Sequence, residues 1–504
     1  MNKKMTILGL ILMIFTSVFG FSNGPIAFYL MGYGSIVWYV LAAFLFFIPY
    51  ALMMAEFGSA YKNESGGIYT WMKDALGERL SFIGTFMWFA SYIIWMVSVA
   101  PKIWITLSTF LSASGSDQTQ KWHFFALNST QVIGVLSIGW MVVLTFVSSR
   151  GMKQIIKITS IGGLAVGVLN VVLLLTSSII LIKNHGQFAQ PPTHLFSSPN
   201  PTYQSQMQVL SFIVFAIFAY GGIEAVGSLV EKTDKPEKNF PKGILLAAVT
   251  IALGYAIGIA CWGISTNWQA VLNHRTTNLG NITYVMMNNL GVQLGQALGL
   301  DASQSTTIGA YFARYTGLSM FLAYTGGFFT LAYSPLKSVI TGTPKEIWSK
   351  KMTQLNKVGM PQNAMWAQFA IVTAIILLSS FISKDPSDFY NKLTLMSNVS
   401  LTLPSVFLVI AFPLFKKNQT IKKEFEVFTS PFSINLVSII VFLVVFGANF
   451  FTVFAPIFEH GQAGVGDTLW MICGPIFFSL CAWFLFNRYA NHHLSQTEEG
   501  LKEK

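Results

Sequence analysis

The stretch Phe218-Ala219-Tyr220-Gly221-Gly222-Ile223-Glu224 places two adjacent glycines and a carboxylate inside an apolar segment long enough to cross a membrane. A carboxylate at membrane depth is energetically expensive, and such groups mark functional sites in membrane proteins. Glycine weakens a helix, and unwound backbone at that depth persists only where it lines a cavity or is buried in protein. The stretch therefore predicts a transport pathway near the middle of the bilayer.

The composition of the whole chain is that of a polytopic membrane protein. It has 504 residues, of which 53% are hydrophobic and 10% are charged, whereas a soluble domain carries about 25% charged residues. The net charge of +11 is spread over many short loops, so no nucleic-acid partner is expected. The three cysteines lie in apolar segments and the seven histidines in loops or tails. Neither a metal site nor another cofactor is therefore expected.

Twelve apolar segments are long enough to span a bilayer, for which about 20 residues are needed. The first follows Lys3 and Lys4 and has no small-x-small cleavage site, so we interpret it as an uncleaved span rather than a signal peptide. The expected spans are 5–31, 36–58, 82–108, 130–149, 155–182, 207–230, 242–265, 311–334, 363–382, 390–414, 434–457 and 467–487.

The basic residues predict the orientation of these spans. With the N-terminus in the cytoplasm, 24 of the 31 lysines and arginines fall on the cytoplasmic side and 7 on the outer side, as the positive-inside rule requires. Both termini are then cytoplasmic, and a bacterial inner membrane fits this bias. The segment 282–300 is also apolar, but its asparagines, glutamines and glycines favour a long outer loop, 266–310, that packs over the mouth of the pathway.

A second interruption lies in the first span, at Gly20-Phe21-Ser22-Asn23-Gly24-Pro25. Spans 1 and 6 correspond to each other if the chain consists of two inverted five-helix repeats plus two extra helices. Paired interruptions of this kind mark the binding sites of secondary transporters. The expected units are 1–182 for the first repeat, 183–415 for the second, 416–487 for spans 11 and 12, and 488–504 for a short, polar cytoplasmic tail.

The ends of interrupted helices indicate the kind of ligand. Freed backbone N–H groups and the positive end of the helix dipole attract a carboxylate, and freed carbonyl groups accept hydrogen bonds from an ammonium. A zwitterionic amino acid therefore suits such a site without any charged side chain. The alternative is that Gly221 and Gly222 only allow close helix packing. The pairing of the two breaks and the adjacent Glu224 favour a binding site.

Two further stretches carry a family resemblance. Gly222 and Glu224 are followed by Glu231 and by Lys235-Pro236-Glu237-Lys238-Asn239-Phe240-Pro241-Lys242-Gly243-Ile244. The first inner loop contains Glu64-Ser65-Gly66-Gly67-Ile68-Tyr69-Thr70-Trp71. Both stretches resemble hallmarks of the amino acid–polyamine–organocation transporter superfamily, and the resemblance covers about residues 5–415. The interruption in span 1 and the residues after it are most similar to the glutamate/gamma-aminobutyrate antiporter branch.

This resemblance implies an all-α polytopic membrane protein of 12 transmembrane helices, with a LeuT-like 5+5 inverted repeat in which helices 1 and 6 are broken. It implies alternating access, and it implies that Phe218 matches an aromatic residue that caps the substrate. Glu224 matches an acidic residue linked to gating or to a proton response. The substrate-binding residues implied by the resemblance are Phe19, Gly20, Phe21, Ser22, Asn23, Phe218, Ala219, Tyr220, Gly221 and Gly222.

The chain departs from the family pattern at two places. The usual Gly-Ser-Gly-like break of span 1 is replaced by Gly20-Phe21-Ser22-Asn23-Gly24. In span 5, Ile161-Gly162-Gly163-Leu164 stands where proton-coupled relatives often carry a lysine. Whether protons take part in transport is therefore open, as is the oligomeric state.

The sequence predicts a secondary transporter of amino acids, with antiport of the glutamate/gamma-aminobutyrate type as the first hypothesis and proton symport as the alternative. A membrane-embedded enzyme would need histidine, paired aspartates or an activated serine in the spans. Apart from Asp467, the first residue of span 12, only Glu224 and the marginal Glu56 are acidic there. A sensor without transport is a further alternative. We expect Glu56 to face the cytoplasmic interface and Lys102 to reach the outer interface. The alternatives are an inner gate at Glu56 and attraction of an anionic substrate by Lys102.

Overall fold

The computed structural model describes residues 6–61, 67–112, 118–150, 153–193, 195–222, 224, 233–383 and 385–502. These residues form helices joined by turns and loops, and no β-strand occurs within the described ranges. Ile223, Glu231 and the stretch Glu64-Ser65-Gly66 of the family resemblance lie outside them.

Helices occupy all twelve of the predicted spans, some of them in two pieces. Those in the first five spans are α1 (Ile7–Val18), α2 (Asn23–Met31), α3 (Gly34–Ala42), the π-helix η1 (Ala43–Phe47), α4 (Ile48–Ala60), α5 (Ile68–Leu111), α6 (Ser129–Ser148) and α7 (Lys153–Lys183). The later ones are α8 (Gln206–Ser211), α9 (Ile213–Phe218), α10 (Pro236–Ser265), α12 (Ala302–Gly342), α14 (Gln362–Ile382), α15 (Pro386–Thr402), α16 (Ser405–Lys417), α17 (Pro431–His460) and α18 (Val465–Lys502). Two more helices, α11 (Ile282–Ala297) and α13 (Lys350–Thr353), lie between predicted spans.

Length and hydropathy of the helices confirm the membrane class. Within the described ranges, eight helical segments are long and apolar enough to cross a bilayer, among them Gly34–Ala60 and Gln362–Ile382. The fold class of an all-α polytopic membrane protein is therefore confirmed. The total of twelve spans and the division into repeats stay predictions.

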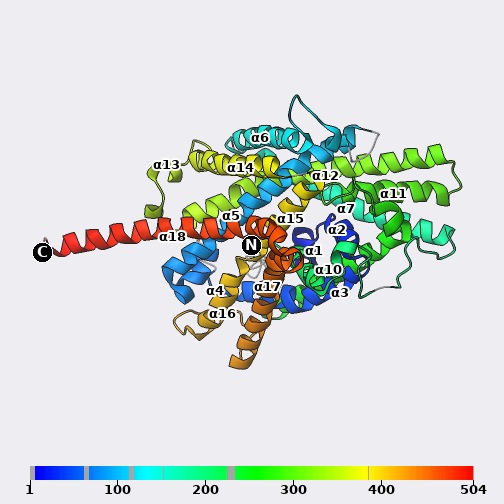
Figure 1. Cartoon of the computed structure of the whole chain (residues 1–504). Helices are drawn as coiled ribbons and strands as arrows, with labels where there is room; N and C mark the ends of the chain where they lie inside the picture. The colour runs from blue at the N-terminus through cyan, green and yellow to red at the C-terminus, as the bar shows by residue number, and fades with distance from the viewer. Residues whose placement is uncertain are drawn as a thin grey trace.

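The helices form one bundle around α5 (Figure 1). This helix packs against α6, α12, α14, α15, α16 and α18. The broken first span, α1 and α2, lies along α10, and α10 also contacts α3 and α4. The two interruptions and α10 are thereby brought into one region of the bundle.

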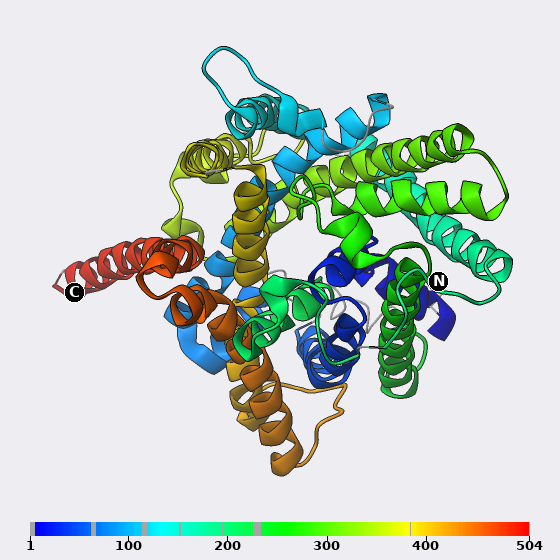
Figure 2. The same cartoon turned by 45° about the vertical axis from the view of Figure 1, so that its right-hand side comes forward.

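The predicted outer loop 266–310 is largely helical. Figure 2 shows α11 and the start of α12 side by side as a hairpin, and Asp301 caps α12 by accepting a hydrogen bond from the Gln304 N–H at 2.8 Å. The two helices approach so closely at Gly291 that a Cβ on this residue would lie 2.8 Å from the Gly309 Cα, and glycine has no Cβ to prevent this. The glycines of this segment thus serve helix packing rather than loop formation. The position of the hairpin outside the membrane stays a prediction.

Two other segments differ from the expectation. Span 10 is interrupted between α15 and α16, at Leu403 and Pro404, because proline has no N–H to continue the helical hydrogen bonds. The C-terminal tail continues α18 as a helix to Lys502, and in Figure 1 this helix projects away from the bundle. No proline or glycine occurs between Asn487 and Glu499 to end it.

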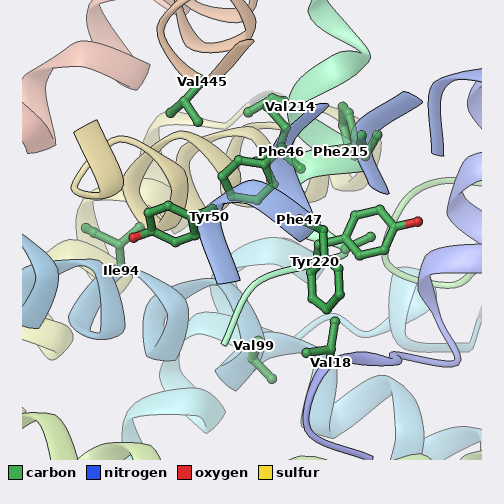
Figure 3. Close-up of a cluster of buried hydrophobic side chains, with 14 of the residues drawn as sticks. Val18, Phe46, Phe47, Tyr50, Ile94, Val99, Val214, Phe215, Tyr220 and Val445 are labelled. Carbon is green, nitrogen blue, oxygen red and sulfur yellow. The ribbon is translucent and has the colours of Figure 1, made fainter. Parts of the chain in front are cut away.

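The hydrophobic core reaches the break in span 6. Figure 3 shows Tyr220 beside Phe47 of η1, in one cluster with Tyr50 and with Phe215 of α9. The ring centroids of Phe47 and Tyr220 lie 5.2 Å apart, and the Tyr220 side chain is fully buried. The core therefore fixes this break against the second span.

Candidate functional site

The break in span 1 is a short non-helical bridge between α1 and α2. Phe19 leaves the helix with an extended backbone (φ −71°, ψ 110°), and its N–H still donates to the Phe15 carbonyl. The Gly20 N–H instead donates to the hydroxyl of Tyr255, at 3.1 Å. The chain re-enters a helix at Asn23, whose backbone N–H donates to the Gly20 carbonyl.

The break in span 6 begins where α9 ends at Phe218. The N–H groups of Tyr220 and Gly221 donate to the carbonyls of Ile217 and Phe218, which closes a tight turn. Gly222 then takes a positive φ of 91°, a conformation that glycine adopts without strain. Gly221 and Gly222 are both exposed. The two glycines therefore let the backbone leave the helix and present itself at a surface.

One hydroxyl group joins the two breaks. Tyr255, on α10, accepts hydrogen bonds from the Gly20 N–H and from the Asn23 side-chain amide, both at 3.1 Å. The same hydroxyl donates to the Ala219 carbonyl at 3.0 Å. Since the side chain is buried, these bonds are worth more than at a wet surface. The breaks of spans 1 and 6, far apart in sequence, thus meet at a single oxygen atom.

Two more tyrosines complete a buried cluster, which we call the tyrosine cluster: Tyr39, Tyr220 and Tyr255. The Tyr220 hydroxyl donates to the Tyr39 carbonyl at 2.9 Å, and the Tyr39 hydroxyl donates to the Asn23 carbonyl at 3.3 Å. The Tyr39 and Tyr255 rings meet edge to face, with centroids 4.7 Å apart. The Tyr220 hydroxyl therefore ties span 6 to span 2.

Small residues bring α10 close to span 1. A Cβ added to Gly254 would lie 3.1 Å from the Phe19 ring, and one added to Gly24 would lie 3.3 Å from the indole nitrogen of Trp262. The Phe19 ring is therefore able to stack on Tyr255, at 4.6 Å between centroids. This packing sets the distance at which the Tyr255 hydroxyl reaches both breaks.

The remaining predicted substrate-binding side chains are spread around the cluster. Phe21 is buried and packs against Trp262. The Ser22 hydroxyl points toward α12, 3.9 Å from the Met320 sulfur. Phe218 is half-buried at the end of α9. The structure thus brings together the backbone of the two breaks, whereas the side chains of Phe21 and Ser22 are directed elsewhere.

Glu224 lies beyond the break in span 6 and faces the second span. Its carboxylate accepts a hydrogen bond from the Tyr50 hydroxyl at 3.4 Å. Tyr50 is buried and its ring stacks on Phe46, at 5.2 Å between centroids. This contact joins the chain after Gly222 to α4.

The expectation for Glu56 is wrong. Its carboxylate is fully buried, 2.7 Å from the Lys416 ammonium, and it accepts hydrogen bonds from the N–H groups of Val427 and Phe428. An unpaired carboxylate cannot be buried cheaply, and the partners come from α16 and the loop after it, which the sequence does not place next to α4. Lys102 is half-buried and donates to the Thr394 hydroxyl at 3.2 Å.

The sequence reasoning missed three polar residues of the spans. Tyr39 and Tyr255 are part of the tyrosine cluster, and a signal existed, because a buried tyrosine hydroxyl usually needs a hydrogen-bond partner. Asn398, near the break in span 10, is fully buried, and its side-chain amide has no hydrogen-bond partner among the described residues. Such a group is rare in a folded protein, which makes Asn398 a further candidate.

Two interrupted helices that meet at a buried tyrosine cluster, in a polytopic helical protein, define the class of secondary transporters. The sequence profile described as amino acid permease matches residues 5–481. The chain therefore belongs to the amino acid permease family. This confirms the superfamily resemblance and the prediction of a transporter rather than an enzyme.

Similar proteins agree with this family. An inner membrane transporter YjeM of Escherichia coli (strain K12) is 57% identical over 489 residues, or 97% of each chain. A glutamate/gamma-aminobutyrate antiporter of Lactococcus lactis subsp. lactis is 24% identical over 399 residues, 77% of this chain and 71% of that protein. The chain is thus a multi-pass inner-membrane protein.

Solved structures show the fold. A crystal structure of the Eremococcus coleocola manganese transporter matches with a TM-score of 0.53 over 95% of this chain and 94% of that one, at 12% sequence identity. At this identity the likeness concerns the fold alone. It confirms the expected LeuT-like transporter fold.

Proposed function

We propose that this permease is an amino-acid antiporter of the glutamate/gamma-aminobutyrate type that works by alternating access. The observation that carries the proposal is the Tyr255 hydroxyl at the meeting point of the two breaks. It accepts from the Gly20 N–H and donates to the Ala219 carbonyl. The backbone thus offers one hydrogen-bond donor for the carboxylate and one acceptor for the ammonium of a zwitterion. The distant antiporter relative supports the same substrate class.

In this proposal the substrate replaces the Tyr255 hydroxyl. Its carboxylate takes the Gly20 N–H and the Asn23 amide, at the start of α2, where the helix dipole favours negative charge. Its ammonium takes the carbonyl of Ala219, at the end of α9. The residues Phe19 to Asn23 and Phe218 to Gly222 then surround the substrate, with Phe218 as the aromatic cap.

Glu224 is the gating residue of the proposal. Its bond to Tyr50 links the chain after the span 6 break to α4, so that a change at the substrate reaches the second span. We further propose the predicted topology, with twelve spans, both termini in the cytoplasm, and repeats over 1–182 and 183–415.

Transport in liposomes tests the function. The purified protein is placed in liposomes loaded with an unlabelled amino-acid mixture or with buffer, and uptake of labelled glutamate, gamma-aminobutyrate and other amino acids is measured at pH 5.5 and 7.5. Antiport predicts uptake only when the lumen holds amino acids. Uptake by empty liposomes under an imposed proton gradient would establish the proton symporter instead. No uptake of any amino acid by folded protein would refute both.

A further inference from the structure

A second cavity lies away from the tyrosine cluster, at the end of the bundle where α2, α8, α15, α17 and α18 meet. Its volume is about 290 Å³, near the lower limit of about 300 Å³ for small-molecule sites, so it suits a small solute. The wall includes Tyr29 of α2, Gln208 of α8 and Met471 of α18. The predicted orientation puts this end on the outer side. None of the ten predicted substrate-binding residues is among those that line it.

Charged groups from two helices line this outer cavity. The Lys392 ammonium, on α15, lies 3.0 Å from the Asp388 carboxylate and 3.4 Å from that of Asp467 on α18. The Asp467 side chain is 50% exposed, against 15% for Lys392. One ammonium therefore stands against two carboxylates. The Glu459 carboxylate, which accepts a hydrogen bond from the side-chain amide of the lining residue Gln208 at 2.7 Å, lies next to the cavity. The excess of negative charge favours a cationic group.

Two residues that line the same cavity carry buried side-chain donors that have no partner among the described residues. Asn278 is 2% exposed, and its side-chain oxygen accepts from the Gly280 N–H, whereas its Nδ2 has no partner among the described residues. The indole nitrogen of Trp470 also has no hydrogen-bond partner among the described residues. Buried donors left unpaired cost free energy, so we expect both side chains to turn toward a ligand carboxylate when one is bound in the cavity.

We propose that the outer cavity is a second amino-acid site, which holds the substrate before it reaches the tyrosine cluster. The ammonium lies at Asp467 and Asp388, and the carboxylate lies at Asn278 and Trp470. The proposal rests on the function proposed above, because it assigns the same zwitterionic substrate to a second place. It also gives span 12, through Asp467 and Trp470, a part in recognition that the ten-helix core does not need.

Protection of a cysteine tests the site without requiring transport. Asn391 is exposed and lines the cavity, so Asn391→Cys should react with a membrane-impermeant methanethiosulfonate added from outside. The labelling of the protein without the added cysteine is subtracted as background. We expect the transported amino acids to slow the remaining labelling. Gln269→Cys, exposed but outside the cavity, is the matched control and should not be protected. The same measurement is repeated in a protein that also carries Gly222→Leu, which should not bind substrate at the tyrosine cluster. Protection that remains there comes from the outer cavity.

Charge variants then identify the group that binds the ammonium. Loss of one charged hydrogen bond predicts that Asp467→Asn needs about tenfold more amino acid for the same protection, while Asp467→Glu restores the wild-type value. Glu424→Gln removes a carboxylate that pairs with Lys422 in the loop between α16 and α17 and does not line the cavity, so it should have no effect.

Two outcomes would overturn the proposal: no protection at Asn391→Cys by amino acids that the protein transports, or unchanged protection in Asp467→Asn. The fate of the antiporter proposal is read separately, from the uptake assay. If no amino acid is transported but protection at Asn391→Cys persists and depends on Asp467, the outer site stands and the transport function fails. If neither occurs, both fail.

Discussion

Replacement of Tyr255 by phenylalanine removes a single oxygen atom and leaves the ring in place. That oxygen has three partners, the Gly20 N–H, the Asn23 side-chain amide and the Ala219 carbonyl. The ring keeps its stack on Phe19 and its edge contact with Tyr39. The variant therefore separates the hydrogen bonds between the two breaks from the packing that surrounds them.

The magnitude follows from the groups that lose their partner. Each buried polar group left unsatisfied costs about 1–3 kcal/mol, and some of the three will find water, so we expect a loss of about 2–4 kcal/mol in the substrate-free state. The substrate supplies its own carboxylate and ammonium to the same groups, so the substrate-bound state loses little. Tyr255→Phe should therefore bind substrate more tightly, by about 10-fold or more.

Thermal unfolding of the detergent-solubilised protein measures both effects. The midpoint of Tyr255→Phe without substrate should lie below that of the wild type, and the rise on adding a transported amino acid should be larger. Tyr39→Phe is the matched control, because its hydroxyl donates only to the Asn23 carbonyl, at 3.3 Å. It should lower the midpoint slightly and leave the affinity unchanged. Weaker or unchanged binding by Tyr255→Phe would show that the substrate does not displace this hydroxyl.

Three further variants address the break, the gate and the ion pair at Glu56. Gly222→Leu forces a branched side chain into a φ of 91° and should abolish substrate binding; unchanged affinity by equilibrium binding would sink the interrupted-helix interpretation. Glu224→Gln should reduce uptake or alter its pH profile while membrane insertion stays intact, and wild-type rates with a wild-type profile would rule out the gating role. Lys416→Met leaves the Glu56 carboxylate buried without its ammonium, which predicts a loss of about 3–5 kcal/mol in stability; an unchanged unfolding midpoint would contradict this.

The positions of the two breaks could be predicted from the sequence, because glycine and proline act locally on the backbone. Gly221-Gly222 and Gly20 to Pro25 stand where α9 and α1 end. Pro404 gives the same local signal in span 10, yet a single proline inside an apolar run does not tell whether the helix bends or stops. The glycines of α11 mislead for the opposite reason, because a glycine that lets two helices approach looks in sequence like one that forms a loop.

The contacts between the breaks could not be predicted, because they depend on tertiary packing. Tyr255 reaches Gly20 across 235 positions of sequence, and the register of α10 against span 1 is set by Gly254 and by the aromatic rings near it. Glu56 presents the same difficulty. Its burial is tolerable only because Lys416 and two backbone N–H groups converge on it. These partners lie far from Glu56 in the sequence, and no local pattern predicts them.

The interrupted span 10 connects these distant features. At one end, Lys392 of α15 pairs with Asp467 of α18; at the other, Lys416 of α16 pairs with Glu56 of α4. Between the two ion pairs the regular helix is interrupted at Leu403 and Pro404, although both residues keep helical backbone angles. In the proposed alternating-access cycle, we expect each half to break its own ion pair while the other half stays tethered. Alternating access needs such independence, because the two ends of the pathway must open one at a time.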